Sequence, residues 1–363
     1  MTAQANSGSP VLRLTGITKR FGETLANDDI SIALRHGELL ALLGENGAGK
    51  TTLMSILFGH YTPDAGTVEV EGATLPPGRP RAAIDAGVGM VHQHFSLAPN
   101  LTVLENVMTG TERLWRLRSD TAGGRAKLLA IAERFGLAVD PDARLGDLSV
   151  GEQQRVEILK ALYNDARILI LDEPTAVLTN IEAANLFVTL REMAAQGLSL
   201  IFISHKLNEV MAAADRVVVL RHGRVVAERT TQATTKQELA ELMVGRRVER
   251  PVREASAPGK PVLEATSVDV TIGGTPKLGG IDFTVHEGEV LGIVGVSGNG
   301  QTTLAHLVSG LVTPSAGTLR LFGSAMPHGV QGLVEAGVGR IPEDRTSEGV
   351  IGEMTIWENA VLE

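Results

Sequence analysis

The sequence lacks cysteine and has few aromatic residues, with 2 tryptophans, 2 tyrosines and 8 phenylalanines in 363 residues. Without cysteine there is no disulfide framework and no thiolate to bind a metal or attack a substrate. No apolar run is long enough to span a bilayer, and residues 1–10 have neither the basic start nor the apolar core of a secretory signal. These absences fit a protein of a reducing cytoplasm.

Positive charge is also scarce, because 33 lysines and arginines face 42 aspartates and glutamates, which gives a net charge of −9. A protein that coats nucleic acid needs clustered Lys and Arg to neutralise phosphates, so we expect no nucleic-acid partner. The remaining composition, 43% hydrophobic and 21% charged, is ordinary for a globular protein, and the length allows two domains.

The chain contains an internal repeat. Residues 37–54, GELLALLGENGAGKTTLM, match residues 288–305, GEVLGIVGVSGNGQTTLA, at an offset of 251. AGVGMVHQ matches AGVGRIPE, and TVLENV matches TIWENA, in the same order at offsets of 250 and 253. A period of this size indicates a duplicated domain rather than a solenoid repeat.

The repeat sets the domain boundaries that we expect. The first domain covers 11–245, and a charged, proline-containing linker covers 246–261. The second domain covers 262–363 and stops soon after the TxxE sequence of residues 355–358, which is typical of a helix N-terminus. We therefore expect this second domain to be partial.

Four short apolar runs in the first domain are bounded by turn or polar residues: LLALLG (39–44), ILILDEP (168–174), LIFISH (200–205) and VVVL (217–220). Such runs are typical of strands that are buried on both faces of a mostly parallel sheet. Helical patterns lie between them, so the sequence predicts an α/β fold. Residues from about 95 to 160 interrupt this alternation and predict a helical subdomain.

The stretch GENGAGKT (44–51) fits the pattern of a P-loop between a strand and a helix. Its glycines let backbone N–H groups surround phosphates, Lys50 reaches the β and γ oxygens, and Thr51 offers a hydroxyl to Mg²⁺. An ordinary glycine-rich turn is the alternative, which the flanking strand and helix disfavour. The candidate nucleotide-binding residues of this loop are Gly44, Asn46, Gly47, Gly49, Lys50, Thr51 and Thr52.

Three polar residues follow predicted strands and are candidates for catalysis. We expect Asp172 to hold Mg²⁺ through water and Glu173 to polarise the attacking water, although an acidic pair can also cap the next helix. His205 follows another strand, and such strand ends face the ligand crevice, so it is a candidate for bonding the γ-phosphate.

Five further candidates each have an ordinary structural alternative or lie beside a residue that does. Ser149 and Gly151 precede a helical stretch and suit an anion site, although an ordinary N-cap is the common alternative, and Gln153 lies beside them. Gln93 is a neutral oxygen donor for Mg²⁺ or water, and its alternative is a polar loop residue. Phe21 is a candidate for stacking on a base, and its alternative is a half-buried core aromatic.

These motifs, in this order, resemble the nucleotide-binding subunit of an ABC transporter: Phe21, the P-loop, Gln93, the signature at 148–152, the acidic strand end and His205. The signature reads LSVGEQQ rather than LSGGQ, PTAVLT stands in place of PTSALD, and the duplication carries an altered second loop. These features are similar to the fused ATPases of simple-sugar and nucleoside importers, and VHQHFSL and LTVLENV most resemble the nucleoside branch.

The resemblance implies a mechanism and partners. MgATP would lie between the P-loop of one domain and the signature of another, in a pseudo-dimer of the two domains or a homodimer. Closure would drive an integral-membrane permease that is served by an extracytoplasmic solute-binding protein, so the chain would lie at the cytoplasmic face of the membrane. Gln93 and the helical subdomain would touch the permease.

The second domain departs from the first at three positions of this pattern, one of them in its P-loop. A neutral amide replaces the cation, an aliphatic side chain replaces the stacking ring, and a carboxylate enters where phosphates would approach. We expect that this loop is not a working hydrolysis site and that the chain alone hydrolyses ATP weakly. The replacements are Gln301 for Lys50, Ile272 for Phe21 and Glu343 for Gln93.

Two other functional classes remain as alternatives. Soluble ABC ATPases that act on the ribosome or on nucleic acid commonly carry two intact P-loops, and the ribosome-acting ones carry a long charged helical linker. The short linker and the altered second loop disfavour that class. A non-catalytic regulatory scaffold is disfavoured because Lys50, Asp172 and Glu173 are intact.

Overall fold

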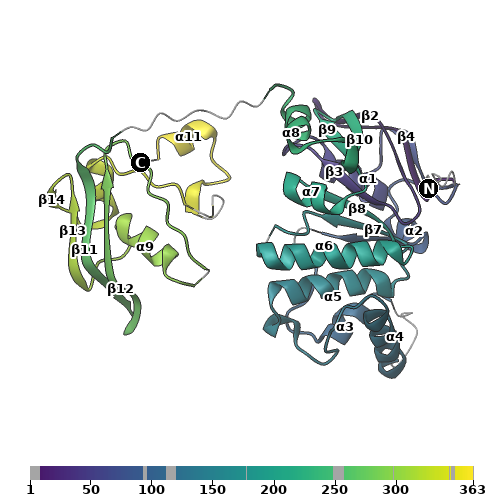
Figure 1. Ribbon diagram of the computed structural model, residues 1–363, viewed down its shortest axis with the longest axis horizontal. Coiled ribbons are helices and arrows are strands. Elements are labelled where there is room, and N and C mark those ends of the chain that lie inside the picture. The colour runs from purple at the N-terminus through teal and green to yellow at the C-terminus, as the bar shows by residue number, and fades with distance from the viewer. Residues whose placement is uncertain are drawn as a thin grey trace. The chain divides into compact units, whose positions relative to one another are not determined.

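The computed structural model describes residues 9–92, 96–111, 120–176, 178–247, 257–296, 298–342, 344 and 348–362. The chain divides into two compact units, Met1–Arg250 and Pro251–Glu363, and each is described by itself (Figure 1). Among the helices of the described residues, none has the length and apolar character that a membrane span requires.

Unit 1 is built on a six-stranded sheet in the order β10-β9-β3-β8-β7-β6. The five strands from β9 to β6 run parallel, and β10 pairs with β9 as an antiparallel edge. The strands are β3 Leu39–Leu43, β6 Val88–Val91, β7 Ile168–Asp172, β8 Ser199–Ser204, β9 Arg216–Arg221 and β10 Arg224–Thr230. The four apolar runs fall on β3, β7, β8 and β9, which confirms the predicted mostly parallel sheet.

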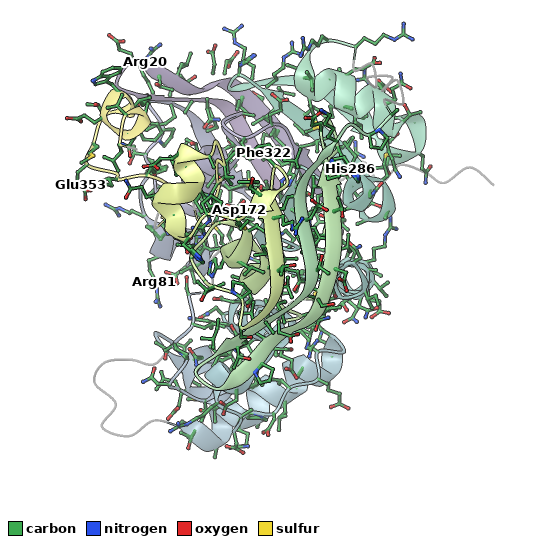
Figure 2. The ribbon with its side chains drawn as sticks, turned by 90° about the vertical axis from the view of Figure 1, so that its left-hand side faces the viewer. Arg20, Arg81, Asp172, His286, Phe322 and Glu353 are labelled. Atoms are coloured by element: carbon green, nitrogen blue, oxygen red, sulfur yellow. The ribbon has the colours of Figure 1, made fainter. Side chains whose placement is uncertain are left out.

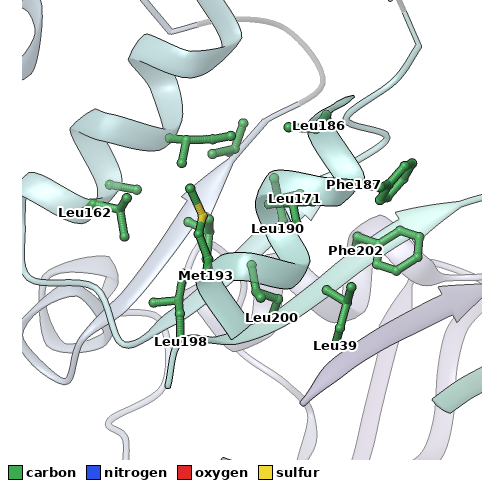
Figure 3. Close-up of a cluster of buried hydrophobic side chains, with 14 of the residues drawn as sticks. Leu39, Leu162, Leu171, Leu186, Phe187, Leu190, Met193, Leu198, Leu200 and Phe202 are labelled. Atoms are coloured by element: carbon green, nitrogen blue, oxygen red, sulfur yellow. The ribbon is translucent and has the colours of Figure 1, made fainter. Parts of the chain in front are cut away.

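Both faces of this sheet are buried. Successive side chains of a strand point to opposite faces, and every residue of β3 and β7 is buried. On one face Leu39 and Phe202 join a core with Leu190 and Met193 of α6 (Asn180–Ala195) (Figure 3). On the other face the alternate residues, such as Leu40, pack with α1 (Lys50–Phe58).

A second, antiparallel sheet in the order β2-β1-β4-β5 shares the core of α1. Its strands are β1 Leu12–Phe21, β2 Thr24–Leu34, β4 Ala65–Val70 and β5 Ala73–Thr74. The remaining helical segments outside the region from β6 to β7 are α2 Pro80–Asp85, α7 Leu207–Ala213, η2 Thr231–Ala233 and α8 Lys236–Val244.

The described residues between β6 and β7 are mainly helical. They form α3 Val103–Met108, α4 Thr121–Arg134, the short η1 Leu145–Asp147 and α5 Val150–Tyr163. Thr102 and Ser149 each begin a helix with a capping box, in which the side chain of the cap and a glutamate three residues later exchange bonds with backbone N–H groups. This is the helical subdomain that the sequence predicts.

Unit 2 repeats the antiparallel sheet of unit 1 in the order β12-β11-β13-β14. Its elements are β11 Pro261–Ile272, β12 Thr275–His286, α9 Gln301–Val308, β13 Ala316–Leu321, β14 Ser324–Ala325, α10 Gly329–Glu335 and α11 Ile356–Ala360. The order of strands and the place of α9 match β2-β1-β4-β5 and α1, so the duplication seen in the sequence is also structural.

One segment of unit 2 differs from its counterpart. Residues 289–296 contain the counterpart of β3 but form no strand, and residues 290–296 are exposed, with Val290 at 77% and Val294 at 96%. In unit 1, β3 lies between β8 and β9. Among the described residues of unit 2, this apolar run pairs with no strand.

Candidate functional site

The loop between β3 and α1 requires glycine at two positions. Gly49 has a φ of 94°, which favours glycine, and a Cβ there would overlap the carbonyl oxygen of Ala26. A Cβ at Gly44 would overlap the carbonyl oxygen of Leu220. The Asn27 side chain donates to the Gly49 carbonyl at 3.0 Å, which fixes the loop against β2. The glycine-rich pattern is therefore a steric requirement of this turn.

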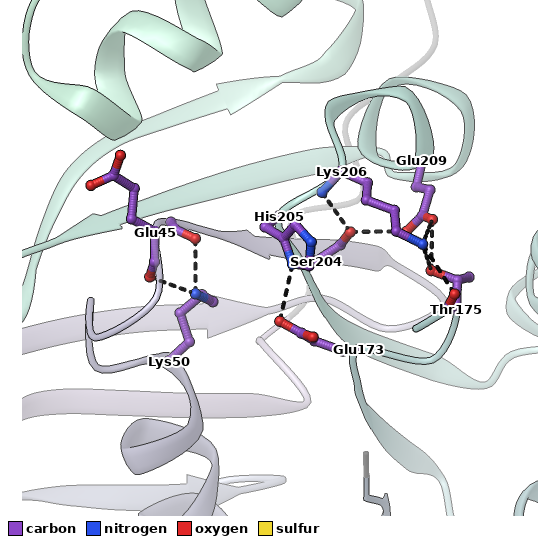
Figure 4. Close-up of polar contacts among 9 residues, drawn as sticks. Glu45, Lys50, Glu173, Thr175, Ser204, His205, Lys206 and Glu209 are labelled. Atoms are coloured by element: carbon purple, nitrogen blue, oxygen red, sulfur yellow. Dashed lines mark hydrogen bonds and ion pairs between the residues drawn. The ribbon is translucent and has the colours of Figure 1, made fainter. Parts of the chain in front are cut away.

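Lys50 is buried at the start of α1. Its Nζ donates to the carbonyl oxygens of Gly44 and Glu45, at 2.8 Å each (Figure 4). Burial lowers the pKa of Lys50, although the negative charges of Glu173, Asp172 and Glu45 oppose this effect. A cation held away from water by its own loop is suited to an anionic ligand such as a phosphate group.

Asp172 ends β7 close to the P-loop (labelled in Figure 2) and hydrogen-bonds with the Thr51 hydroxyl. It is 6% exposed, and burial raises the pKa of its carboxyl group, with the charge of Glu173 as a second cause. A buried carboxylate beside a hydroxyl supplies the hard oxygen ligands that Mg²⁺ prefers. The described residues contain no cluster of three or more His, Asp or Glu that could hold a metal by itself, and Mg²⁺ in such sites takes its other ligands from phosphates and water.

Glu173 follows β7 in a left-handed backbone conformation, with a φ of 47°. This conformation costs a non-glycine residue about 1–3 kcal/mol and persists only where the surroundings hold it. Its N–H donates to the Ile203 carbonyl at 3.2 Å, and its Oε1 lies 3.1 Å from Nδ1 of His205. The structure therefore brings together two side chains that the sequence predicted separately.

Phe21 lies at the end of β1 and is 43% exposed. Tyr61 meets it edge to face at 5.3 Å between ring centroids, and the Lys19 Nζ lies 5.4 Å from its centroid. The exposed ring is free enough of the core to stack on a planar ligand. Sequence reasoning missed Tyr61, which belongs to no motif.

Ser149, Gly151 and Gln153 lie at the start of α5. Ser149 is the N-cap, and its hydroxyl bonds with Glu152 at 2.7 Å. The Gln153 side chain donates to the Leu148 carbonyl at 3.0 Å, within its own loop. Ser149 therefore acts as the N-cap of α5, which is the alternative that the sequence left open. An anion-binding role for these residues stays a prediction.

Gln93 and Glu343 lie outside the described residues. The neighbouring His92 is described, and its ring stacks on that of His60 with centroids 5.6 Å apart. Burial lowers the pKa of His92, and the charge of His60 adds to this effect. The sequence did not predict this histidine pair.

Sequence reasoning also missed the polar residues that hold the loop after Glu173. Gln154 of α5 donates to the carbonyl of Pro174. Thr175 donates to Glu209 of α7 at 2.6 Å. These partners belong to no P-loop pattern and become visible only in the fold.

The described end of the unit 2 loop has the backbone conformation of the first loop but not its charge. Gly300 has a φ of 94°, as Gly49 does, and α9 begins at Gln301 as α1 begins at Lys50. The Gln301 amide donates to the Val296 carbonyl at 3.1 Å. The side chain therefore turns back to its own loop, as Lys50 does, but carries no positive charge.

Comparison with known proteins gives one family. The family model described as ABC transporter matches residues 27–176 and 278–363. A glucose import ATP-binding protein of Haloferax volcanii is 45% identical over 97% of this chain and 70% of its own length. A nucleoside import ATP-binding protein of Lactococcus lactis is 43% identical with the same coverage.

Solved structures agree with this result. An ATP-binding cassette of an ABC transporter in its ADP conformation is 27% identical, with a TM-score of 0.58, and the match covers 65% of this chain and 96% of that one. A dimeric ATP-binding cassette bound to ADP and Pi is 25% identical, with a TM-score of 0.53, over 61% of this chain and all of that one. The predicted P-loop fold is confirmed.

Proposed function

The chain belongs to the ABC transporter family, and from this premise we propose that it is the ATP-binding subunit of an importer for nucleosides or simple sugars. It hydrolyses ATP to drive transport through a partner permease. The glucose and nucleoside relatives are import proteins, which favours this function over an action on ribosomes or nucleic acid. The observation that carries the proposal is the arrangement in unit 1, where Lys50 lies near Asp172 and Glu173, and Glu173 contacts His205.

Each residue of this site has a proposed role. Lys50 and the loop N–H groups bind the phosphates, and Phe21 stacks on the base. Thr51 and Asp172 would hold Mg²⁺, which supplies neutralisation of the phosphate charge when bound. The nucleotide site also includes the loop residues Gly44, Asn46, Gly47, Gly49 and Thr52, and Gln93 is proposed as a further ligand of Mg²⁺ or water.

Glu173 is proposed to polarise the attacking water, and His205 to hydrogen-bond the γ-phosphate. The 3.1 Å contact between these two side chains supports their joint action, because both must face the same phosphate. Substrate positioning is a large part of phosphoryl-transfer catalysis, since the chain itself forms no covalent bond in this reaction.

The signature residues complete the site of a facing cassette in this proposal. Ser149, Gly151 and Gln153 would meet the nucleotide of another domain, in a pseudo-dimer or between two copies. The loop of unit 2 lacks the cation, and loss of one charge-assisted hydrogen bond of about 1.5–3 kcal/mol weakens binding by roughly ten- to 150-fold. We therefore assign ATP hydrolysis to the P-loop of unit 1, which carries Lys50.

The permease is proposed to dock beside the helical subdomain, at the cytoplasmic face of the membrane, with a solute-binding protein on the other side. A groove of about 880 Å³ lies there between α2 and α4. Charges of both signs line it, including Arg81, Lys127, Asp85 and Asp165. Such a lining suits a polar protein segment better than a small apolar ligand.

Labelled ATP tests the proposal in the full chain. Lys50→Ala should lose ATP binding by at least tenfold, whereas Glu173→Gln should keep binding and lose hydrolysis. The proposal is wrong if Lys50→Ala binds as well as the unsubstituted chain. Fractionation at moderate salt separates the alternatives, since the proposed subunit co-purifies with membranes and a ribosome-acting ATPase with ribosomes.

A further inference from the structure

Glu209, in the first turn of α7, lies at the centre of a polar cluster beside the catalytic pair. Its carboxylate accepts the Thr175 hydroxyl at 2.6 Å and the Ser204 hydroxyl at 2.9 Å (Figure 4). The Lys206 Nζ lies 3.2 Å from the same carboxylate. Each oxygen of Glu209 therefore faces a donor.

The other side chains of the cluster also have hydrogen-bond partners. The Ser204 hydroxyl accepts from the backbone N–H of Lys206 at 3.0 Å. The Lys206 Nζ donates to the Thr175 carbonyl at 3.0 Å and to the Thr175 hydroxyl at 3.2 Å. Thr175 is 2% exposed and Ser204 is 3% exposed, so their hydroxyls depend on these protein partners.

This cluster joins the two segments that carry the catalytic pair. Ser204 directly precedes His205, and Thr175 follows Glu173 by two residues. Between them, Gln154 holds the Pro174 carbonyl from the side of α5. The left-handed conformation of Glu173 needs such support, because a strained residue relaxes where its neighbours do not hold it.

A role in capping its own helix does not explain the position of Glu209. A glutamate in the first turn commonly bonds with the backbone N–H of the N-cap residue. The N-cap of α7 is Lys206, which makes no side-chain capping bond, and the Glu209 carboxylate instead receives the Thr175 and Ser204 hydroxyls. The carboxylate thus serves the loops of the site rather than α7.

We propose that Glu209 is a positioning residue for hydrolysis, which holds the loop after Glu173 against the end of β8 and so sets the Glu173–His205 contact. This inference rests on the proposed function. Glu209 touches neither of the two side chains directly in the contacts described, and acts through Thr175 and Ser204.

The test compares Glu209→Gln with Glu209→Asp in the full chain. An amide replaces one of the two acceptor oxygens by an NH₂ donor, so it cannot accept the two hydroxyls on separate oxygens as Glu209 does, whereas Asp keeps two acceptor oxygens. We expect Glu209→Gln to lower kcat by about 10- to 100-fold, as loss of a supporting hydrogen bond does in other sites, with KM and ATP affinity within about twofold. Glu209→Asp should recover part of kcat. The matched control is Glu192→Gln, an exposed residue of α6, which should leave kcat unchanged.

A spectroscopic measurement keeps the test independent of turnover. The ¹⁵N shifts of the His205 ring report the hydrogen bond at Nδ1, and Glu209→Gln should move them in the same direction as Glu173→Gln. The effects of Thr175→Val and Glu209→Gln on kcat should be non-additive, because both substitutions disturb the hydrogen bond between Thr175 and Glu209. Unchanged kcat and unchanged His205 shifts in Glu209→Gln would overturn the inference, as would equal losses of ATP affinity and kcat. If the unsubstituted chain itself binds no ATP, the proposed function fails instead.

Discussion

Asp172 is the residue at which function and stability are expected to conflict. Its carboxyl group has a raised pKa because burial and the charge of Glu173 outweigh the Thr51 hydrogen bond and the Lys50 charge. The ionised carboxylate is therefore less stable in the folded chain than in water. Asp172→Asn keeps the shape and removes this charge, so the nucleotide-free variant should be more stable at neutral pH.

The gain follows from linkage between protonation and folding. Each unit by which folding raises the pKa costs about 1.4 kcal/mol at a pH above both values. Below the unfolded value of 3.8 both forms are protonated and this cost vanishes. We expect the free energy of unfolding to be larger for Asp172→Asn than for the unsubstituted chain at pH 7.5, and this difference to shrink as the pH falls towards 4.

Urea unfolding of the nucleotide-free chain measures this difference at pH 7.5 and at pH 4. Addition of MgATP should reverse the order, because a ligand at 100 times its Kd stabilises the unsubstituted chain by about 2.7 kcal/mol and the variant much less. A variant that is less stable than the unsubstituted chain at pH 7.5, or equally stabilised by MgATP, would refute the reasoning.

Three further predictions concern a glycine of the P-loop, the ring proposed to stack on the base, and a buried ion pair. Gly49→Ala should weaken ATP binding by more than tenfold in an equilibrium binding assay, because a Cβ collides with the Ala26 carbonyl, and normal affinity would contradict this. Phe21→Ala should cost about 1–3 kcal/mol of ATP binding with little change in melting temperature, since the ring is exposed, and Phe21→Trp should restore affinity. Arg216→Met should lower the free energy of unfolding by about 3–5 kcal/mol, because it leaves the buried Glu38 without its ion-pair partner, while Arg229→Met at an exposed pair should cost at most about 1 kcal/mol. Equal costs for the two arginine variants would show that burial of the pair is not the cause.

Much of this fold could be predicted because its signals are local. A continuous apolar run such as β7 has to be buried on both faces, and a GxxxxGKT stretch between a strand and a helix is typical of a phosphate-binding loop. The site residues at strand ends followed from the same rule, since parallel strands present their carboxyl ends at one edge.

The missed features depend on contacts between distant residues. Thr175 and Glu209 are 34 residues apart, and neither residue type predicts the other. The Phe21–Tyr61 pair likewise joins β1 to the loop after α1. Residues 289–296 repeat the sequence pattern of β3 but form no strand, because a strand also needs neighbouring strands to pair with its backbone groups.

The two P-loops act as a natural control for the role of Lys50. Gly49 and Gly300 have the same φ of 94°, and the residue after each begins a helix and donates to carbonyl groups of its own loop. Since Gln301 achieves this with a neutral amide, the loop conformation does not require a cation. Burying the Lys50 charge is costly, as its lowered pKa shows, because the nearby charges of Glu173, Asp172 and Glu45 oppose the effect of burial without outweighing it. The positive charge of unit 1 is therefore best explained by an anionic ligand rather than by the stability of the loop.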